Sequence, residues 1–144
     1  MKKPHSQTVI AVILFFVFLI VAAGFATALA VVFAPIKADV TDDACALSFL
    51  WYKQNVVYTE VEEIAMLDDT YAPTRVNSFG GISKDFGTYK SDELGKHFRL
   101  TYSENKHNYI LLKRKDGSVI VFNQKTQEAT KALYENLSEK IPAE

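Results

Sequence analysis

The sequence contains a single cysteine, Cys45, which excludes an intrachain disulfide and a zinc site built from cysteines. The residues before it, from Thr41 to Ala44, are polar and do not form the apolar box that precedes a lipid-modified cysteine. Free cysteines usually behave as small buried hydrophobic residues. We therefore expect Cys45 to lie inside the fold on a strand and not to act as a reactive thiol.

An excess of basic residues is also missing. The formal net charge is −1, from 16 Lys and Arg and 17 Asp and Glu. Because Lys2 and Lys3 precede the rest, 14 basic and 17 acidic side chains remain from Ile36 onward, a net charge of −3. Nucleic-acid phosphates and anionic lipids attract clustered Lys and Arg. The sequence therefore predicts no nucleic-acid binding and no polybasic attachment to lipid.

Charged residues are absent from Val9 to Ala34. As a helix this run would be about 39 Å long, which exceeds the roughly 30 Å hydrocarbon core of a bilayer. The sequence therefore predicts a protein integral to the membrane. The expected segments are a basic arm at residues 1–7, a transmembrane helix at 8–35, a linker at 36–43 and a domain at 44–141.

A cleaved signal peptide is the alternative to a retained anchor. Lys2 and Lys3 would form its basic start, and Ala28-Leu29-Ala30 has the small-x-small form that signal peptidase prefers. The apolar run is longer than the about 7–15 residues of a signal sequence and continues beyond that site. Its length favours a retained anchor, whereas cleavage would release the domain as a secreted binding protein.

Flanking charges predict the orientation of the apolar run. Lys2 and Lys3 lie before it, whereas Lys37 lies after it and is followed by acidic residues. Basic residues favour the cytoplasmic side. We expect a single-pass protein of the cell membrane, with a cytoplasmic N-terminus and an extracytoplasmic domain. The difference is two lysines against one, so the alternative of a cytoplasmic domain stays open.

Small residues recur every fourth position in this run. They are Ala22, Ala26 and Ala30 in one series, and Gly24 and Ala28 in another. Such faces let transmembrane helices pack closely, which would allow self-association. An Ala-rich segment also produces this spacing by composition alone, so both interpretations stay open.

After the apolar run, the sequence predicts short strands and then one helix. Apolar residues alternate with polar ones, and turn-forming residues separate the runs. The expected strands lie at residues 44–52, 56–58, 61–67, 86–90, 98–103, 109–115 and 119–122. We expect the polar residues Lys53 to Asn55 to form a break between the first two strands. We expect Asp116-Gly117 to form a type I′ turn.

The period changes near the C-terminus to that of a helix. One helical face carries Ala129, Ala132, Leu133, Leu137 and Ile141. Asn123 or Thr126 can cap this helix, and Pro142 marks its end. These patterns predict an α+β fold, mostly β: an antiparallel barrel or split sandwich closed by a C-terminal helix.

Few residues could support catalysis. His97 and His107 are the only histidines after the apolar run. No Ser or Cys has the context of a nucleophile elbow, and the spacing of the two histidines matches no recognised zinc site. We expect His97 to face outward beside Arg99, and His107 to lie in a turn. The sequence therefore predicts a protein that is not an enzyme and uses no cofactor or metal.

A set of glycine and hydrophobic positions between Val61 and Leu137 is typical of one family. The matching stretches are Arg75-Val-Asn-Ser-Phe-Gly80, Phe86-Gly87-Thr88-Tyr89, Gly95 with Phe98, Leu100 and Tyr102, Tyr109 to Lys113, Asp116 to Asn123, and Ala132-Leu133-Tyr134 with Leu137. They resemble motifs of the bacterial pleckstrin-homology-like domains. The chain departs from that family at Ser78, where Gly is usual, so the resemblance does not fix the local backbone there.

The resemblance implies a seven-stranded barrel capped by a helix and used for binding, not catalysis. It does not imply phosphoinositide recognition, because the expected first strand–strand loop has Lys53 as its only basic residue. Loops that a barrel positions commonly bind partners. The candidate residues for binding a protein or peptide partner near the bilayer are Arg75, Asn77, Phe79 and Lys84. Alternatively, Arg75 and Asn77 only satisfy backbone groups in an irregular loop.

Lys113, Arg114 and Lys115 form a basic triplet just before the Asp116-Gly117 turn. Alternation along a strand would direct Lys113 and Lys115 to one side and Arg114 to the other. The triplet could contact anionic lipid as a peripheral surface. The alternative is a hairpin end that is simply solvated.

Overall fold

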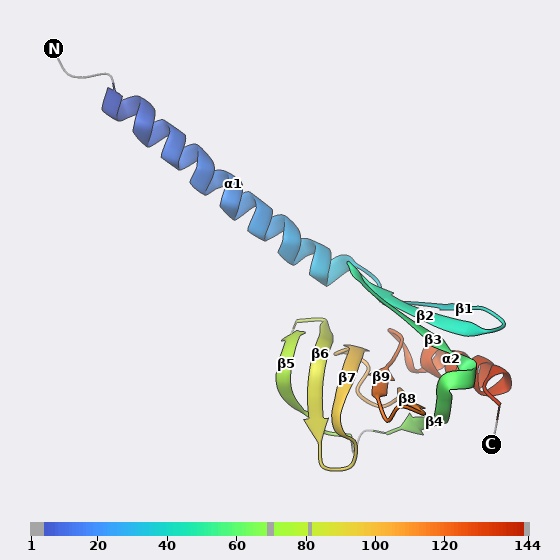
Figure 1. The fold of residues 1–144 in the computed structure, drawn as a ribbon. Helices are drawn as coiled ribbons and strands as arrows, with labels where there is room; N and C mark the ends of the chain where they lie inside the picture. Colours follow the sequence, from blue (N-terminus) through green and yellow to red (C-terminus); the bar gives the residue numbers. More distant parts are fainter. Residues whose placement is uncertain (1–4, 69–70, 81, 143–144) are drawn as a thin grey trace. The chain divides into compact units, whose positions relative to one another are not determined.

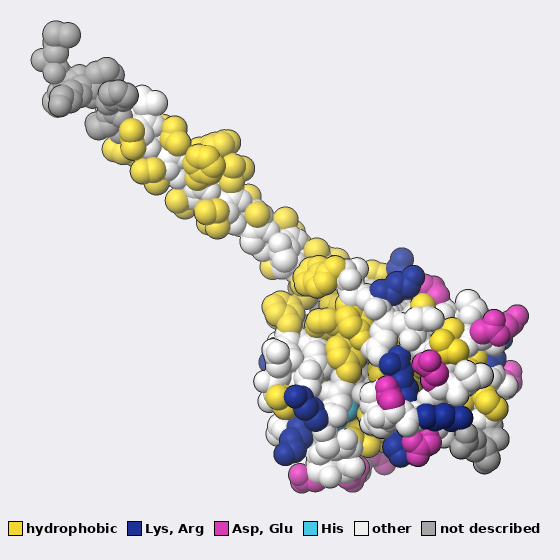
Figure 2. Space-filling view, in the orientation of Figure 1, with side chains coloured by type: hydrophobic (Ala, Val, Ile, Leu, Met, Phe, Trp, Pro, Cys, Tyr) yellow, Lys and Arg dark blue, Asp and Glu magenta, His cyan; other side chains and the backbone are white. Residues whose placement is uncertain are grey.

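A computed structural model describes residues 5–68, 71–80 and 82–142 (Figure 1). The chain divides into two compact units, residues 1–34 and 35–144. The first contains helix α1, His5–Phe33, whose side chains are hydrophobic along most of the described length (Figure 2). Its Gln7–Phe33 segment is long and apolar enough to cross a membrane, a property that signal sequences share.

The second unit, here called the domain, is built mainly of strands. Its described elements are β1 (Lys37–Val40), β2 (Ala44–Phe49), β3 (Tyr52–Val57), the 3₁₀ turn η1 (Tyr58–Glu60), β4 (Val61–Leu67), β5 (Thr74–Gly80), β6 (Lys84–Ser91), β7 (Gly95–Tyr102), β8 (Tyr109–Arg114), β9 (Val119–Phe122) and α2 (Gln127–Lys140). The predicted α+β class, mostly strands with a C-terminal helix, is confirmed.

The strands form two sheets. β1, β2 and β3 make an antiparallel three-stranded sheet, and a six-stranded sheet has the order β4-β8-β9-β7-β6-β5. All described pairings are antiparallel except that of β7 with β9, which is parallel. Within the described ranges neither sheet closes on itself, so the expected barrel is not confirmed.

The six-stranded sheet buries side chains on both of its faces. On β8, Ile110 and Leu112 alternate with Tyr109 and Leu111, and all four are buried. Rings from the β2–β3 hairpin lie against one face, where Tyr52 stacks on Phe98 and packs edge-on against Phe86. A second hydrophobic cluster occupies the other face and consists of Tyr71, Tyr109, Leu111, Val119 and Val121. Because both faces are covered, consecutive residues are buried along all of β9 and most of β8.

The linker expected at residues 36–43 is wrong. Residues Lys37–Val40 form β1, which pairs with β2. Ile36 is only 3% exposed, and its N–H donates a hydrogen bond to the Tyr102 hydroxyl at 2.9 Å. The domain therefore begins at Pro35. Ala34 and Pro35 are the only residues between the end of α1 and the buried Ile36.

The break expected at Lys53 to Asn55 is also wrong. These residues lie within β3 and pair with β2, for example Lys53 with Ser48. The chain turns earlier, at Leu50 and Trp51, and Leu50 has a φ of 54°. Pairing with a buried neighbouring strand outweighs the low strand preference of polar residues.

The Asp116-Gly117 hairpin forms, but not with the expected turn type. Gly117 has a φ of 83°, and Leu50 is the only described non-glycine residue with positive φ. A type I′ turn needs positive φ at both central residues, so this turn belongs to another class. The Asp116 carboxylate accepts hydrogen bonds from the N–H and the hydroxyl of Ser118, at 2.8 and 2.6 Å.

The predicted C-terminal helix is confirmed, and its buried face differs in part. Thr126 caps α2 by accepting the N–H of Ala129 at 3.1 Å. Leu137 and Ile141 are buried as expected, whereas Ala129 and Ala132 are exposed and Thr130 is buried instead. The Thr130 hydroxyl donates to the Thr126 carbonyl at 2.8 Å, so this polar residue is satisfied inside the fold.

Candidate functional site

Arg99 is a buried cation at the centre of the six-stranded sheet. It lies on β7, and only 8% of the residue is exposed. Its guanidinium carbon lies 5.1 to 5.3 Å from the ring centroids of Tyr71, Tyr89 and Tyr109. Tyrosine ring faces attract a cation most strongly where water is excluded. The expectation of an outward-facing residue is therefore wrong for Arg99.

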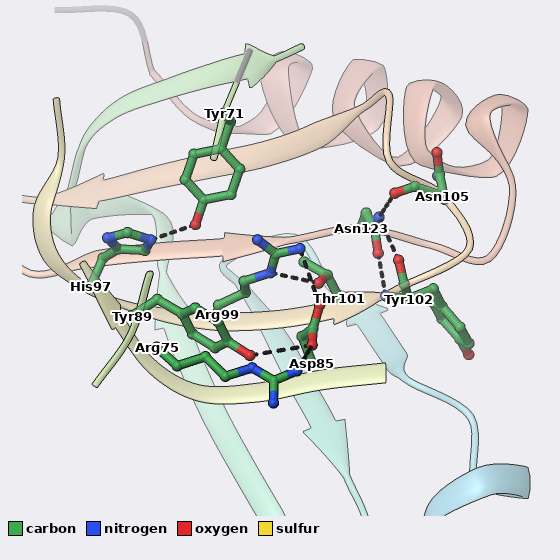
Figure 3. A network of polar contacts seen from close by, with 10 residues as sticks. All are labelled: Tyr71, Arg75, Asp85, Tyr89, His97, Arg99, Thr101, Tyr102, Asn105 and Asn123. Atoms are coloured by element: carbon green, nitrogen blue, oxygen red, sulfur yellow. Dashed lines mark hydrogen bonds and ion pairs between the residues drawn. The ribbon is translucent and has the colours of Figure 1, made fainter. Parts of the chain in front are cut away.

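Asp85 on β6 joins Arg99 to the surface residue Arg75 (Figure 3). Its carboxylate oxygens lie 3.2 Å from the Arg99 guanidinium and 3.3 Å from that of Arg75. The Tyr89 hydroxyl donates to the same carboxylate at 3.3 Å, and Arg99 Nε donates to the Thr101 hydroxyl at 2.9 Å. One carboxylate thus faces two arginines, which leaves local positive charge.

His97 lies on the same face of β7 and is 3% exposed, contrary to the expectation that it faces outward. Its Nδ1 lies 2.9 Å from the Gly95 carbonyl, which can only accept a hydrogen bond. Nδ1 therefore carries the proton, and Nε2 accepts from the Tyr71 hydroxyl (Figure 3). Burial is the main cause that lowers the pKa of His97 and raises that of Tyr71. Both ring nitrogens are engaged within the fold.

A pocket of about 470 Å³ opens over this network. Its walls are Tyr71, Arg75, Asp85, Arg99, Ser103, Lys106, His107 and Tyr109. Arg75, Arg99 and Lys106 outnumber Asp85, so the lining has a positive excess. In the part of the chain that the structure describes, the buried hydroxyl oxygen of Ser103 has no hydrogen-bond partner. The pocket therefore combines positive charge with an unpaired hydroxyl, which suits a carboxylate or another small anionic group.

Three of the four predicted partner-binding residues share one exposed strand. Arg75, Asn77 and Phe79 are exposed on β5, and Arg75 also lines the pocket. Lys84 is only 5% exposed, and its ammonium lies 5.7 Å from the centroid of the Phe49 ring. Burial lowers the pKa of Lys84. The structure therefore groups the first three residues at an edge strand and places Lys84 inside.

The basic triplet makes contacts within the domain. The Lys113 ammonium lies 2.9 Å from the Glu62 carboxylate, whose hydrogen bond raises the pKa of Lys113. Arg114 donates to the carbonyl of Asn55 at 3.0 Å. The Lys115 N–H donates to the carbonyl of Glu60 at 2.8 Å. These contacts fit a hairpin end that is held against η1 and β3.

The cage around Arg99 was missed because its parts are distant in sequence. Tyr71, Tyr89 and Tyr109 come from three different segments, and no local pattern links them to Arg99. Across the described ranges, no three His, Cys, Asp or Glu side chains lie together as metal ligands would. Comparisons with protein-family models, curated protein sequences and solved structures found no match to the chain.

Proposed function

We propose that the protein is a membrane-anchored interaction module whose domain binds a protein or peptide partner near the bilayer and catalyses no reaction. The observation that carries this proposal is the positively charged pocket beside the exposed strand β5. Among the described strands, β5 pairs with β6 alone. Its free edge offers backbone N–H and C=O groups to which an extended segment can add.

The chemistry of the pocket indicates what the partner would carry. An acidic side chain or a C-terminal carboxylate on the added segment would meet Arg75, Lys106 and the Ser103 hydroxyl. The Asp85 carboxylate holds Arg99 in place and would keep its guanidinium aimed at the pocket. We therefore propose an extended, acidic segment as the partner.

The anchor is the second part of the proposal. Retention is supported by the length of the apolar segment Gln7–Phe33. A cytoplasmic N-terminus is supported by Lys2 and Lys3, which lie outside the described residues.

The pleckstrin-homology-like character of the domain also belongs to the proposal. Strands followed by one C-terminal helix support it, whereas the parallel pairing of β7 with β9 departs from a simple meander.

Two measurements test the anchor in cells that express the chain with a C-terminal tag. The expected result is a full-length mass and resistance to alkaline carbonate extraction, with the tag digested by protease added outside the inner membrane. A mass that begins after Ala28-Leu29-Ala30 would show cleavage and a secreted domain. Protection of the tag would reverse the proposed orientation.

Selection of displayed peptides on the detergent-solubilised chain tests the partner. We expect enriched peptides to contain an acidic residue and to bind roughly 10- to 100-fold more weakly to Arg75→Ala, as the loss of a charge-assisted hydrogen bond implies. Lys131→Ala is the matched control, because Lys131 is an exposed cation on α2. Peptides that bind Arg75→Ala and the unsubstituted chain equally would exclude this pocket.

A further inference from the structure

Two turns of the domain expose large apolar side chains. Trp51, in the β2–β3 turn, is 79% exposed, and Ile82, between β5 and β6, is 86% exposed. Phe79 near the end of β5 is 60% exposed. Such residues are common singly on a surface, but a group of them on neighbouring turns indicates a contact surface.

The contacts of the domain place these turns at the end where its chain begins. Ile36 binds the Tyr102 hydroxyl, and Tyr102 pairs with Lys84 at the start of β6, next to the turn that carries Ile82. The Lys84 ammonium lies over the rings of both Tyr102 and Phe49, at 5.2 and 5.7 Å. Phe49 is the last residue of β2.

The β2–β3 turn is fixed against the same end. Tyr52, which follows Trp51, packs against Phe86 on β6, and Phe86 pairs with Phe79. In Figure 2, hydrophobic side chains gather on the domain surface near the start of β1. Trp51, Phe79 and Ile82 are called the apolar end below.

We propose that the apolar end inserts into the headgroup region of the bilayer, a proposal that rests on α1 being a retained anchor. Only Ala34 and Pro35 separate α1 from the buried Ile36. Three residue steps from Phe33 reach at most about 11 Å, so Ile36 lies within that distance of the end of α1. Tryptophan is enriched at this depth because its ring is apolar and its N–H is polar.

The covalent tether favours lipid over a protein as the occupant. Ile36 is held by a hydrogen bond inside the domain, so the tether between α1 and the folded domain is short. The basic triplet does not share this end. Lys113 pairs with Val119 at the start of β9, whereas Tyr102 lies beyond the level of Phe122 at the end of β9. Attachment through the apolar end therefore depends on its hydrophobic and aromatic side chains and not on the basic triplet.

Trp51 provides the test without any substitution. It is the only tryptophan of the chain, so intrinsic tryptophan emission reports on the apolar end alone. The full chain is reconstituted into phosphatidylcholine vesicles whose acyl chains are brominated near the glycerol end. We expect blue-shifted emission and quenching of about half or more of the intensity, as for an indole at headgroup depth.

Two substitutions and a separate measurement make the outcomes distinct. Ile82→Ser and Phe79→Ser should each reduce the quenching of Trp51, whereas Val76→Ser on the same strand, 52% exposed, should leave it unchanged. Water-like, unquenched emission from vesicles that retain the chain after carbonate extraction would overturn the proposal and leave the anchor intact. Blue-shifted emission that bromine does not quench and that grows with protein density would assign the apolar end to a second copy and also overturn it. Loss of the chain from the vesicles would instead remove the anchor.

Discussion

The carboxylate of Asp85 lies 3.2 Å from the guanidinium of Arg99, and both side chains are largely shielded from water, at 15% and 9% exposed. The same carboxylate contacts Arg75, whose side chain is 53% exposed. One acid therefore makes a buried and a solvated ion pair at once. Burial makes the first contact costly to break, because a lone charge left inside the fold keeps its full desolvation cost.

Asp85→Asn should lower the free energy of unfolding by about 3 kcal/mol, the lower end of the values for breaking a buried pair. Arg75→Gln should cost less than about 1 kcal/mol, because an exposed pair contributes little. Chemical denaturation of the detergent-solubilised chain, followed by near-ultraviolet circular dichroism, measures both. Equal effects of the two substitutions would contradict the buried role of Arg99.

Asn123→Ala should destabilise the domain by about 3 kcal/mol, because it leaves two buried backbone groups unpaired. The Asn123 side chain accepts the N–H of Tyr102 at 2.7 Å and donates to the carbonyl of Asn105 at 2.8 Å (Figure 3). Asn136→Ala is the matched control at an exposed position of α2. The same denaturation measurement applies, and a change below about 1 kcal/mol for Asn123→Ala would show that water replaces the amide.

His97 should make the domain less stable as the solution becomes mildly acidic. Burial lowers its pKa below the ordinary 6.5. In mild acid the imidazole is therefore protonated in the unfolded chain and still neutral in the folded chain. Above about pH 6.5, the effect of His97 on the free energy of unfolding is fully favourable to the folded state. As the pH falls from there to the folded-state pKa, the free energy of unfolding decreases by up to about 1.4 kcal/mol per pH unit.

Stability measured between pH 7 and pH 5 tests this effect. The fall with decreasing pH should be shallower in His97→Gln than in the unsubstituted chain, since the other titrating groups are common to both. His107→Gln, which removes an exposed imidazole, is measured beside it as the matched control. Identical slopes for the unsubstituted chain and His97→Gln would contradict the burial of His97.

Sequence reasoning succeeded where a local pattern determines the structure. The apolar run, the strand from Phe98 to Tyr102 and the helix capped by Thr126 each depend on neighbouring residues, and each is present. The prediction is wrong where strand pairing outweighs the preference of the residues themselves. Lys53 to Asn55 lie in a strand because β3 pairs with β2. Lys37–Val40 form β1 because they also pair with β2, and Tyr102, far along the chain, binds Ile36 just before them.

The candidate site divides in the same way. Residue types alone indicate Arg75, Asn77 and Phe79 as binding residues, and the structure exposes them together on β5. An alternating strand has one polar face by default, so the sequence predicts that Arg99 and His97 face solvent. That face is covered by Tyr71 and by neighbouring strands, a fact that only the tertiary structure contains.

Cys45 should react with a maleimide only when the domain opens. The residue is fully buried on β2, and burial is the main cause that raises the pKa of its thiol to about 11. Because the thiolate is the reactive form, both factors slow labelling. We expect a rate at least about a thousandfold below that of an exposed thiol, since opening costs a large part of the global stability.

Lys131→Cys, made in a Cys45→Ala background, supplies the exposed reference on α2. Mass spectrometry of timed samples gives both rates, and rates within tenfold of each other would mean that β2 opens far more easily than its burial implies.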